Sequence, residues 1–177
     1  YNTASSAQDQ NRQPLRIRAV NAATDISLYA GTMSVSDDSA NSSTLGDIIV
    51  EGGSITVGDS VTLTNLTQSG GSITLQSSIV TAVIKGGTMN LYDSTSVSTI
   101  TTLTVSDSGS VNHFASGTIT TLNLNGGTID LTKTQSAKTI TTVNADTGAT
   151  MITDTGTVTL TNDIALAASK KITIGFS

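Results

Sequence analysis

Apolar and polar residues alternate along most of the chain, in short segments that follow paired glycines. The alternation is clearest at 54–57, 72–75, 88–91 and 128–131. An alternation with a period of two is typical of a β-strand that buries one face and exposes the other. The pattern therefore predicts a succession of short strands, each with one buried face.

A nine-residue phrase that ends in the glycine pair recurs along the chain. Its first and fourth residues are apolar, its sixth is apolar or glutamine, and its last two are glycine. Clear copies occupy 45–53, 63–71, 79–87 and 119–127, and weaker copies occupy 23–31, 100–109 (with one extra residue) and 140–148. Self-similarity at a short period predicts a repeat architecture.

Each phrase contains a second strand, and this strand is expected to bend. In the copy at 119–127, Ile119, Leu122 and Leu124 are predicted to point inward. Two polar residues separate Ile119 from Leu122, so the alternation breaks there and indicates a corner. The nearly identical segments 99–103, 118–122 and 139–143 predict threonine ladders on neighbouring coils.

The glycines that close the phrases are 16 to 22 residues apart, at positions 31, 53, 71, 87, 109, 127 and 148. Short strands separated by a glycine corner at this interval describe one turn of a β-solenoid, with equivalent strands stacked in parallel about 4.8 Å apart. We therefore predict an all-β fold, a single-chain parallel β-solenoid of about seven coils over 23–156. Residues 1–22 are predicted to form an extended N-terminal arm, and 157–177 to form capping strands.

Charge is sparse and unevenly placed. Charged residues make up 12% of the chain and about a third of all residues are serine or threonine, whereas an ordinary globular domain has about 25% charged residues. The arm contains Arg12, Arg16 and Arg18 but only one acidic residue, Asp9, so its net charge is +2. Because the whole chain has a net charge of −5, the rest of the chain has a net charge of −7. An acidic body argues against nucleic acid as a partner, because phosphate binding needs a clustered basic face.

The ends of the sequence and its apolar runs bear on location. No run of about 18 apolar residues occurs, so no membrane-spanning segment is expected. The chain begins at Tyr1, without an initiator methionine or a signal sequence. We therefore expect a processed or partial chain.

Candidates for catalysis are few. His113 is the only histidine, and a register shift is expected to turn Phe114 inward and His113 outward, with a Ser-His-Asp site as the alternative. Asp37 and Asp38 are expected to solvate a long loop, and the alternative is the acid–base pair of a sugar-cleaving β-helix. No calcium-binding Gly-Gly-x-Gly-x-Asp repeat occurs. We therefore expect no catalytic, cofactor or metal site.

Two aliphatic residues occupy outward positions where other copies of the phrase have threonine, asparagine or serine. Ile49 and Val83 are on the same repeat column, two coils apart. They are predicted to form part of a subunit seam, with a homotrimer as the preferred closure. The alternative is that each is a lone exposed aliphatic residue, which is common on protein surfaces.

The coil represented by ITTLNLNGGTI at 119–129 resembles the β-solenoid structural proteins of tailed-phage virions, including head-decoration proteins and fibres. It is also similar, more weakly, to passenger segments of bacterial adhesins and autotransporters. The resemblance covers 23 to about 155 and implies an exposed, multimeric module with a separate attachment segment.

The leading hypothesis from this resemblance is a non-enzymatic virion surface protein that decorates or cements a phage head. Arg12, Arg16 and Arg18 would attach it to the major capsid protein or to another shell protein, although these arginines could instead solvate a strand cap. The alternatives are a secreted adhesin or surface-layer module on a cell surface and a polysaccharide-cleaving β-helix.

Overall fold

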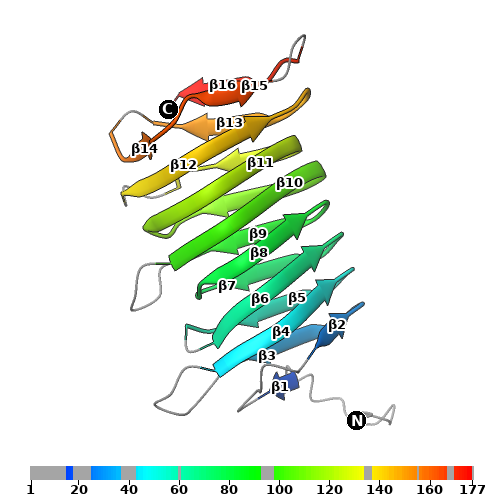
Figure 1. The fold of residues 1–177 in the computed structure, drawn as a ribbon. Coiled ribbons are helices and arrows are strands. Elements are labelled where there is room, and N and C mark those ends of the chain that lie inside the picture. The colour runs from blue at the N-terminus through cyan, green and yellow to red at the C-terminus, as the bar shows by residue number, and fades with distance from the viewer. Residues whose placement is uncertain are drawn as a thin grey trace.

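The computed structural model describes residues 15–17, 25–36, 43–59, 61–92, 98–133, 137–154, 156–166 and 170–176. Within these ranges every regular element is a β-strand (Figure 1). The strands are β1 (Leu15–Ile17), β2 (Ile26–Leu28), β3 (Thr32–Val35), β4 (Ser43–Val50), β5 (Ser54–Val57), β6 (Val61–Gln68), β7 (Ser72–Leu75), β8 (Ile79–Ile84), β9 (Thr88–Leu91), β10 (Ser98–His113), β11 (Gly117–Asp130), β12 (Lys138–Ala145), β13 (Thr150–Thr153), β14 (Val158–Leu160), β15 (Ile164–Leu166) and β16 (Thr173–Phe176).

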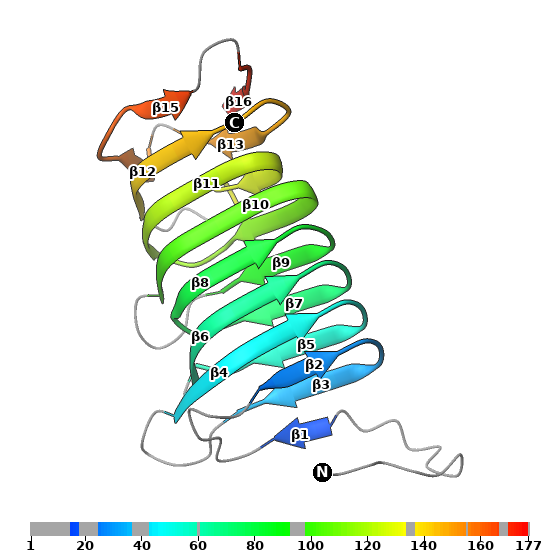
Figure 2. The same ribbon diagram turned by 45° about the vertical axis from the view of Figure 1, so that its right-hand side comes forward.

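The strands form two sheets on opposite faces of the stack (Figure 2). The long-strand sheet contains β2, β4, β6, β8, the first halves of β10 and β11, then β12, β14 and β15. The short-strand sheet contains β1, β3, β5, β7, β9, the second halves of β10 and β11, then β13 and β16. Every pairing is parallel, so the predicted parallel β-solenoid is confirmed, with about six turns between its glycine corners.

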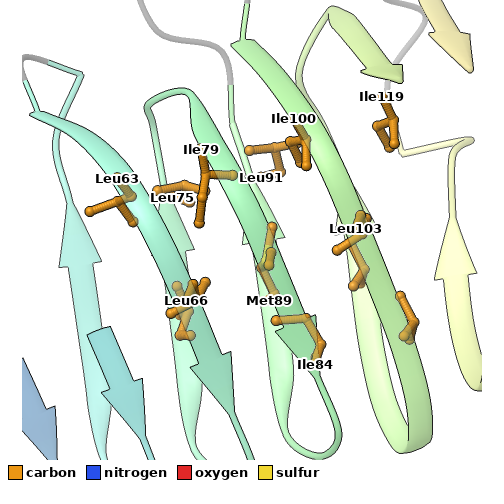
Figure 3. Packing of buried hydrophobic residues seen from close by; sticks show 14 of the residues in the cluster. Leu63, Leu66, Leu75, Ile79, Ile84, Met89, Leu91, Ile100, Leu103 and Ile119 are labelled. Atoms are coloured by element: carbon orange, nitrogen blue, oxygen red, sulfur yellow. The ribbon is translucent and has the colours of Figure 1, made fainter. Parts of the chain in front are cut away.

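The ladder register aligns apolar side chains into columns that fill the interior. One column of the long-strand sheet consists of Leu45, Leu63, Ile79, Ile100, Ile119 and Ile140. One column of the short-strand sheet consists of Met33, Ile55, Ile73, Met89, Val111, Ile129 and Met151. All of these side chains are buried, and Figure 3 shows members of both columns between the two sheets. A single continuous core therefore runs along the stack.

The bend predicted within each phrase is present. In β11, Ile119, Leu122 and Leu124 are buried, as predicted, and Thr120 between them is exposed. The ladder between β10 and β11 aligns Ile100 with Ile119 and then Thr102 with Thr121, with no pair in between. The threonine columns are also confirmed, since the register aligns Thr99, Thr118 and Thr139 and, separately, Thr102, Thr121 and Thr142.

The corner glycines allow successive coils to approach closely. Gly71 has φ of +70°, and a Cβ atom at this position would lie 2.4 Å from the backbone oxygen of Gly53 on the preceding coil. The corner at 100–109 differs, because its extra residue forms a β-bulge between Asp107 and Ser110. There Asp107, rather than Gly109, has the positive φ, at +52°.

Strands continue the stack at both ends. Residues 15–17 of the predicted arm form β1, which pairs in register with β3. The predicted capping segment contains β14, β15 and β16, which pair with β12 and β13 and continue their columns. Strands β1 and β16 therefore occupy opposite ends of the short-strand sheet (Figure 1).

Candidate binding surfaces

His113 lies in the interior, so the expectation that a register shift turns it outward is wrong. It is 2% exposed and pairs with Leu91 in the inward column. The bulge at 107–110 absorbs the extra residue upstream, so Val111 and His113 keep the inward parity. Phe114 then takes the outward position, where its ring stacks on Tyr92 with 4.5 Å between the ring centroids and 7° between the planes. The imidazole is therefore not accessible to a substrate.

The adjacent carboxylates Asp37 and Asp38 lie outside the described residues. Three other aspartates, Asp130, Asp146 and Asp154, each accept hydrogen bonds within a local turn. The part of the chain that the structure describes contains no group of three or more histidines and carboxylates that could hold a metal ion.

Asp130 ends β11 and is buried, unlike most aspartates of this chain. Its Oδ1 accepts hydrogen bonds from the backbone nitrogen of Thr132 at 2.9 Å and from the Thr132 hydroxyl at 2.8 Å. Its Oδ2 lies 2.9 Å from Nζ of Lys133. Burial raises the pKa of the Asp130 carboxyl, but the hydrogen bonds from Lys133 and Thr132 outweigh it, so the pKa lies below its ordinary value.

The lowered pKa of Asp130 predicts an acid-sensitive contribution to stability. A carboxyl whose pKa falls on folding stabilises the folded state above its ordinary pKa of about 3.9, and this contribution is lost as the pH falls through the folded value. Asp130→Asn is therefore expected to lower the melting temperature at pH 7, and the difference from the original chain should shrink progressively as the pH falls below about 4. Melting curves between pH 7 and pH 3 measure this, with Asp163→Asn in an exposed loop as the control. A difference that stays constant with pH would contradict the assignment.

Outward side chains form polar ladders between coils. On the short-strand sheet, Asn112 Nδ2 donates to Asn90 Oδ1 at 2.9 Å. On the long-strand sheet, Asn65 Nδ2 donates to Asp47 Oδ1 at 2.7 Å, and Asn144 Nδ2 donates to Asn123 Oδ1 at 2.9 Å. A further outward column of hydroxyls contains Thr32, Ser54, Ser72, Thr88, Ser110, Thr128, Thr150 and Thr173. Both sheets thus present regular polar faces with few charged side chains.

The predicted seam residues lie in one column of the long-strand sheet. The register aligns Ile49 with Thr67 and Thr67 with Val83, so Ile49 and Val83 are two coils apart as predicted. Ile49 is 42% exposed and Val83 is partly exposed. Val80, on the same strand as Val83, is 47% exposed, and we call these three apolar residues the seam (Ile49, Val80 and Val83).

The sequence did not single out Val80, because it lies at the bend, where the alternation breaks and inward and outward positions are hard to tell apart. Its neighbour Ile79 is buried and Val80 turns outward. The available signal was comparison with the other copies of the phrase, which have glycine or threonine at this position.

Of the three arginines expected to mediate attachment, only Arg16 falls within the described residues. It lies in β1, where its backbone pairs with Ser34 of β3. Arg12 and Arg18 lie outside the described residues. The backbone of Arg16 is therefore placed at the first edge of the short-strand sheet.

A shallow hollow of about 430 Å³ lies near the last coil. Its lining comes from three successive coils, which is why no local motif indicated it. The lining residues are Asn125, Asn144, Ala145, Asp146, Ala165 and Leu166. The hydrogen bond from Lys170, whose Nζ lies 2.9 Å from Asp146 Oδ1, is the main reason that the pKa of Asp146 lies below its ordinary value, and the backbone nitrogen of Thr147 adds to this effect.

No protein-family model, no curated protein and no solved structure matches this chain. Within the described residues there is also no helix of the length and apolarity that crossing a membrane requires. A functional interpretation therefore rests on the surfaces described above.

Proposed function

We propose that this chain is a non-enzymatic structural protein of a virion surface, which binds and stabilises a phage head as a decoration or cement protein. The observation that carries the proposal is the position of β1. This strand contains Arg16 of the basic arm and forms the first edge of a stack that is otherwise acidic. A basic segment held at one end of a β-solenoid can attach to an acidic shell while the coils project from it.

The character of the coils supports an exposed structural role. Their core is continuous from β2 to β13. Several of their outward amides are paired between coils, as in the Asn90–Asn112 and Asn123–Asn144 ladders. Such cross-strand side-chain pairs add to the backbone ladders that hold successive coils together.

The seam supports the proposed homotrimer. Ile49, Val80 and Val83 are apolar residues on the outward face of one sheet, where neighbouring columns carry polar side chains. Packing around a three-fold axis would cover this strip in each subunit and leave the short-strand sheets outward.

Attachment can be tested with purified heads of the phage whose genome encodes the chain, stripped of the native protein. Arg12→Glu combined with Arg18→Glu should reduce co-sedimentation with these heads at least tenfold, because the arm changes from basic to acidic. The matched control, Lys85→Glu combined with Lys171→Glu, makes the same change in net charge at exposed lysines of the stack and should leave binding nearly unchanged. Equal binding by the two variants would contradict attachment through the arm.

Location can be tested independently by immunogold labelling with an antibody against residues 25–166. The proposal predicts gold particles over phage heads. Gold confined to the surface of bacterial cells would instead support the adhesin alternative and overturn the virion assignment.

A further inference from the structure

Asn125 differs from the other described asparagines in having an unbonded side chain. Every other asparagine in the described ranges has its side-chain amide in a hydrogen bond with a neighbouring coil: Asn65, Asn90, Asn112, Asn123, Asn144 and Asn162. The side chain of Asn125 makes no hydrogen bond with the part of the chain that the structure describes, and it is exposed. Its amide group can therefore rotate toward the backbone that follows it.

Gly126, the residue after Asn125, leaves its backbone nitrogen open to approach. Glycine has no Cβ atom that would keep another group away from its own nitrogen, and Asn125–Gly126 is the only Asn-Gly pair in the sequence. Other copies of the phrase have glutamate, serine or lysine before the glycine pair, at Glu51, Ser69 and Lys85. An asparagine followed by a glycine is therefore a feature of this corner alone.

The corner that contains Gly126 is also less regular than the others. Gly126 pairs with Asp107, and directly after this pair the register between β10 and β11 shifts at the bulge between Asp107 and Ser110. Gly126 has φ of +114°. The glycines at the same position of the phrase do not have positive φ in three other copies, at Gly52, Gly70 and Gly86. The backbone at Gly126 is therefore outside the geometry that the other corners share.

The exposure of Asn125 comes from its outward position. Strand β11 lies between β10 and β12 in the stack (Figure 2), so both neighbouring coils are already in place. Leu124, the residue before Asn125, is buried, and Asn125 points away from the core. Asn125 is thus open to solvent on the side of the stack rather than at one of its ends.

We propose that Asn125 is a site of spontaneous deamidation, in which the backbone nitrogen of Gly126 displaces the side-chain amide nitrogen. The Gly126 nitrogen loses its proton and bonds to Cγ of Asn125, the Cγ–Nδ2 bond breaks, and ammonia leaves after taking up a proton. Water then opens the resulting cyclic imide. Opening at Cγ gives aspartate, and opening at the main-chain carbonyl carbon gives isoaspartate, whose peptide linkage runs through the side chain. The reaction needs only water, and the inference does not depend on the virion assignment.

The two products are expected to differ in stability. Aspartate should fit the fold, because other copies of the phrase have Glu51 and Asp146 at this position. Isoaspartate lengthens the backbone by one carbon atom at a corner where a Cβ atom on Gly127 would already lie 2.6 Å from the backbone oxygen of Gly109. Both products therefore add a negative charge, and the isoaspartate fraction should also lower the melting temperature.

Ageing of the folded chain in mildly alkaline buffer tests the proposal. Peptide mass spectrometry should show conversion at Asn125 at least about tenfold faster than at Asn65 and Asn144, a difference of about 1.4 kcal/mol in the barrier. Those two asparagines are also exposed, but they are hydrogen-bonded and no glycine follows them. A synthetic peptide of residues 120–130 gives the rate of the unrestrained segment, and labelling by an isoaspartyl methyltransferase measures the isoaspartate fraction.

Two variants assign the effect to this residue. Asn125→Gln retains an amide on a longer side chain that does not close the same ring, so an aged sample should keep the charge and melting temperature of a fresh one. Asn125→Asp has the charge of the products with the normal linkage, and it should melt close to the original chain. A larger loss of melting temperature in the aged original chain would then report isoaspartate.

Three results would count against the proposal. Conversion that is no faster at Asn125 than at Asn65 and Asn144 would overturn it. An aged chain without product, after the peptide has converted, would also overturn it, because the fold would then hold the Gly126 nitrogen away from Asn125. An equal loss of melting temperature in aged Asn125→Gln would locate the damage elsewhere and would contradict the predicted effect of isoaspartate.

Discussion

Replacing Leu122 with aspartate is expected to prevent the chain from folding. Leu122 is fully buried, and the register places it between Leu103 and Val143 of the neighbouring coils. Removing a buried leucine side chain costs about 2 to 5 kcal/mol, and burying a carboxylate without a partner adds several kcal/mol more. The sum is comparable to the whole stability of an ordinary domain, about 5 to 15 kcal/mol.

The adjacent residue provides a matched control. Asn123 is outward, accepts a hydrogen bond from Asn144 Nδ2 and donates one to Thr104 Oγ1. Aspartate can still accept the first, and the Thr104 hydroxyl can donate to it in place of the second. Asn123→Asp should therefore cost less than about 1 kcal/mol. Soluble yield and chemical unfolding followed by circular dichroism compare the two variants. A soluble Leu122→Asp protein with an unchanged unfolding midpoint would overturn the inward assignment of this column.

Gly71→Ala is expected to cause the second-largest loss of stability. An alanine there must adopt a left-handed conformation, which costs about 1 to 2 kcal/mol. Its Cβ would also meet the backbone oxygen of Gly53 at 2.4 Å, an oxygen that accepts a hydrogen bond from the Ser72 nitrogen. Relief of this clash requires the coils to move apart, so we expect a total loss of about 3 kcal/mol or more.

Gly148→Ala separates the two contributions. Gly148 has φ of +86°, but a Cβ atom there would have no neighbour within 4 Å. This variant should therefore lose only the conformational part, about 1 to 2 kcal/mol. Unfolding free energies from denaturant titration give both values. Equal losses at the two positions would show that close approach between coils does not constrain the glycine corners.

The sequence was sufficient for the solenoid because its determinants are local and repeated. The inward positions of Ile119, Leu122 and Leu124 follow from alternation within one strand, and the bend follows from the two polar residues between Ile119 and Leu122. The glycine pairs mark corners, because successive backbones approach there too closely for a side chain. Each copy of the phrase repeats these signals, so the assignment of inward positions and corners in one copy can be checked against the other copies.

His113 shows where this reasoning fails. The prediction placed a register shift at His113 itself, but the extra residue of this coil is absorbed upstream, between Asp107 and Ser110. The position of a bulge depends on pairing with both neighbouring coils, and a single segment does not contain that information. Stacking of Phe114 on Tyr92 also depends on residues 22 positions apart in the sequence.

The candidate surfaces were less predictable than the fold. The shared column of Ile49 and Val83 follows from the repeat, but the exposure of Val80 depends on how the strand turns at the bend. The hollow beside Asp146 combines residues from three coils, and the ion pair with Lys170 joins the corner after β12 to the segment before β16. Such surfaces arise from the stacking of coils, which no single copy of the phrase encodes.

By itself, the sequence determined that this chain forms parallel coils with glycine corners, an apolar interior, polar faces with few charges and a basic segment before the first coil. These properties follow from strand alternation and backbone sterics, which act over a few residues at a time. Only the tertiary structure decided where the extra residue of the coil at 100–113 is absorbed, which keeps His113 inward and stacks Phe114 on Tyr92. The position of that bulge depends on pairing with both neighbouring coils, and a single segment of the sequence does not contain that information.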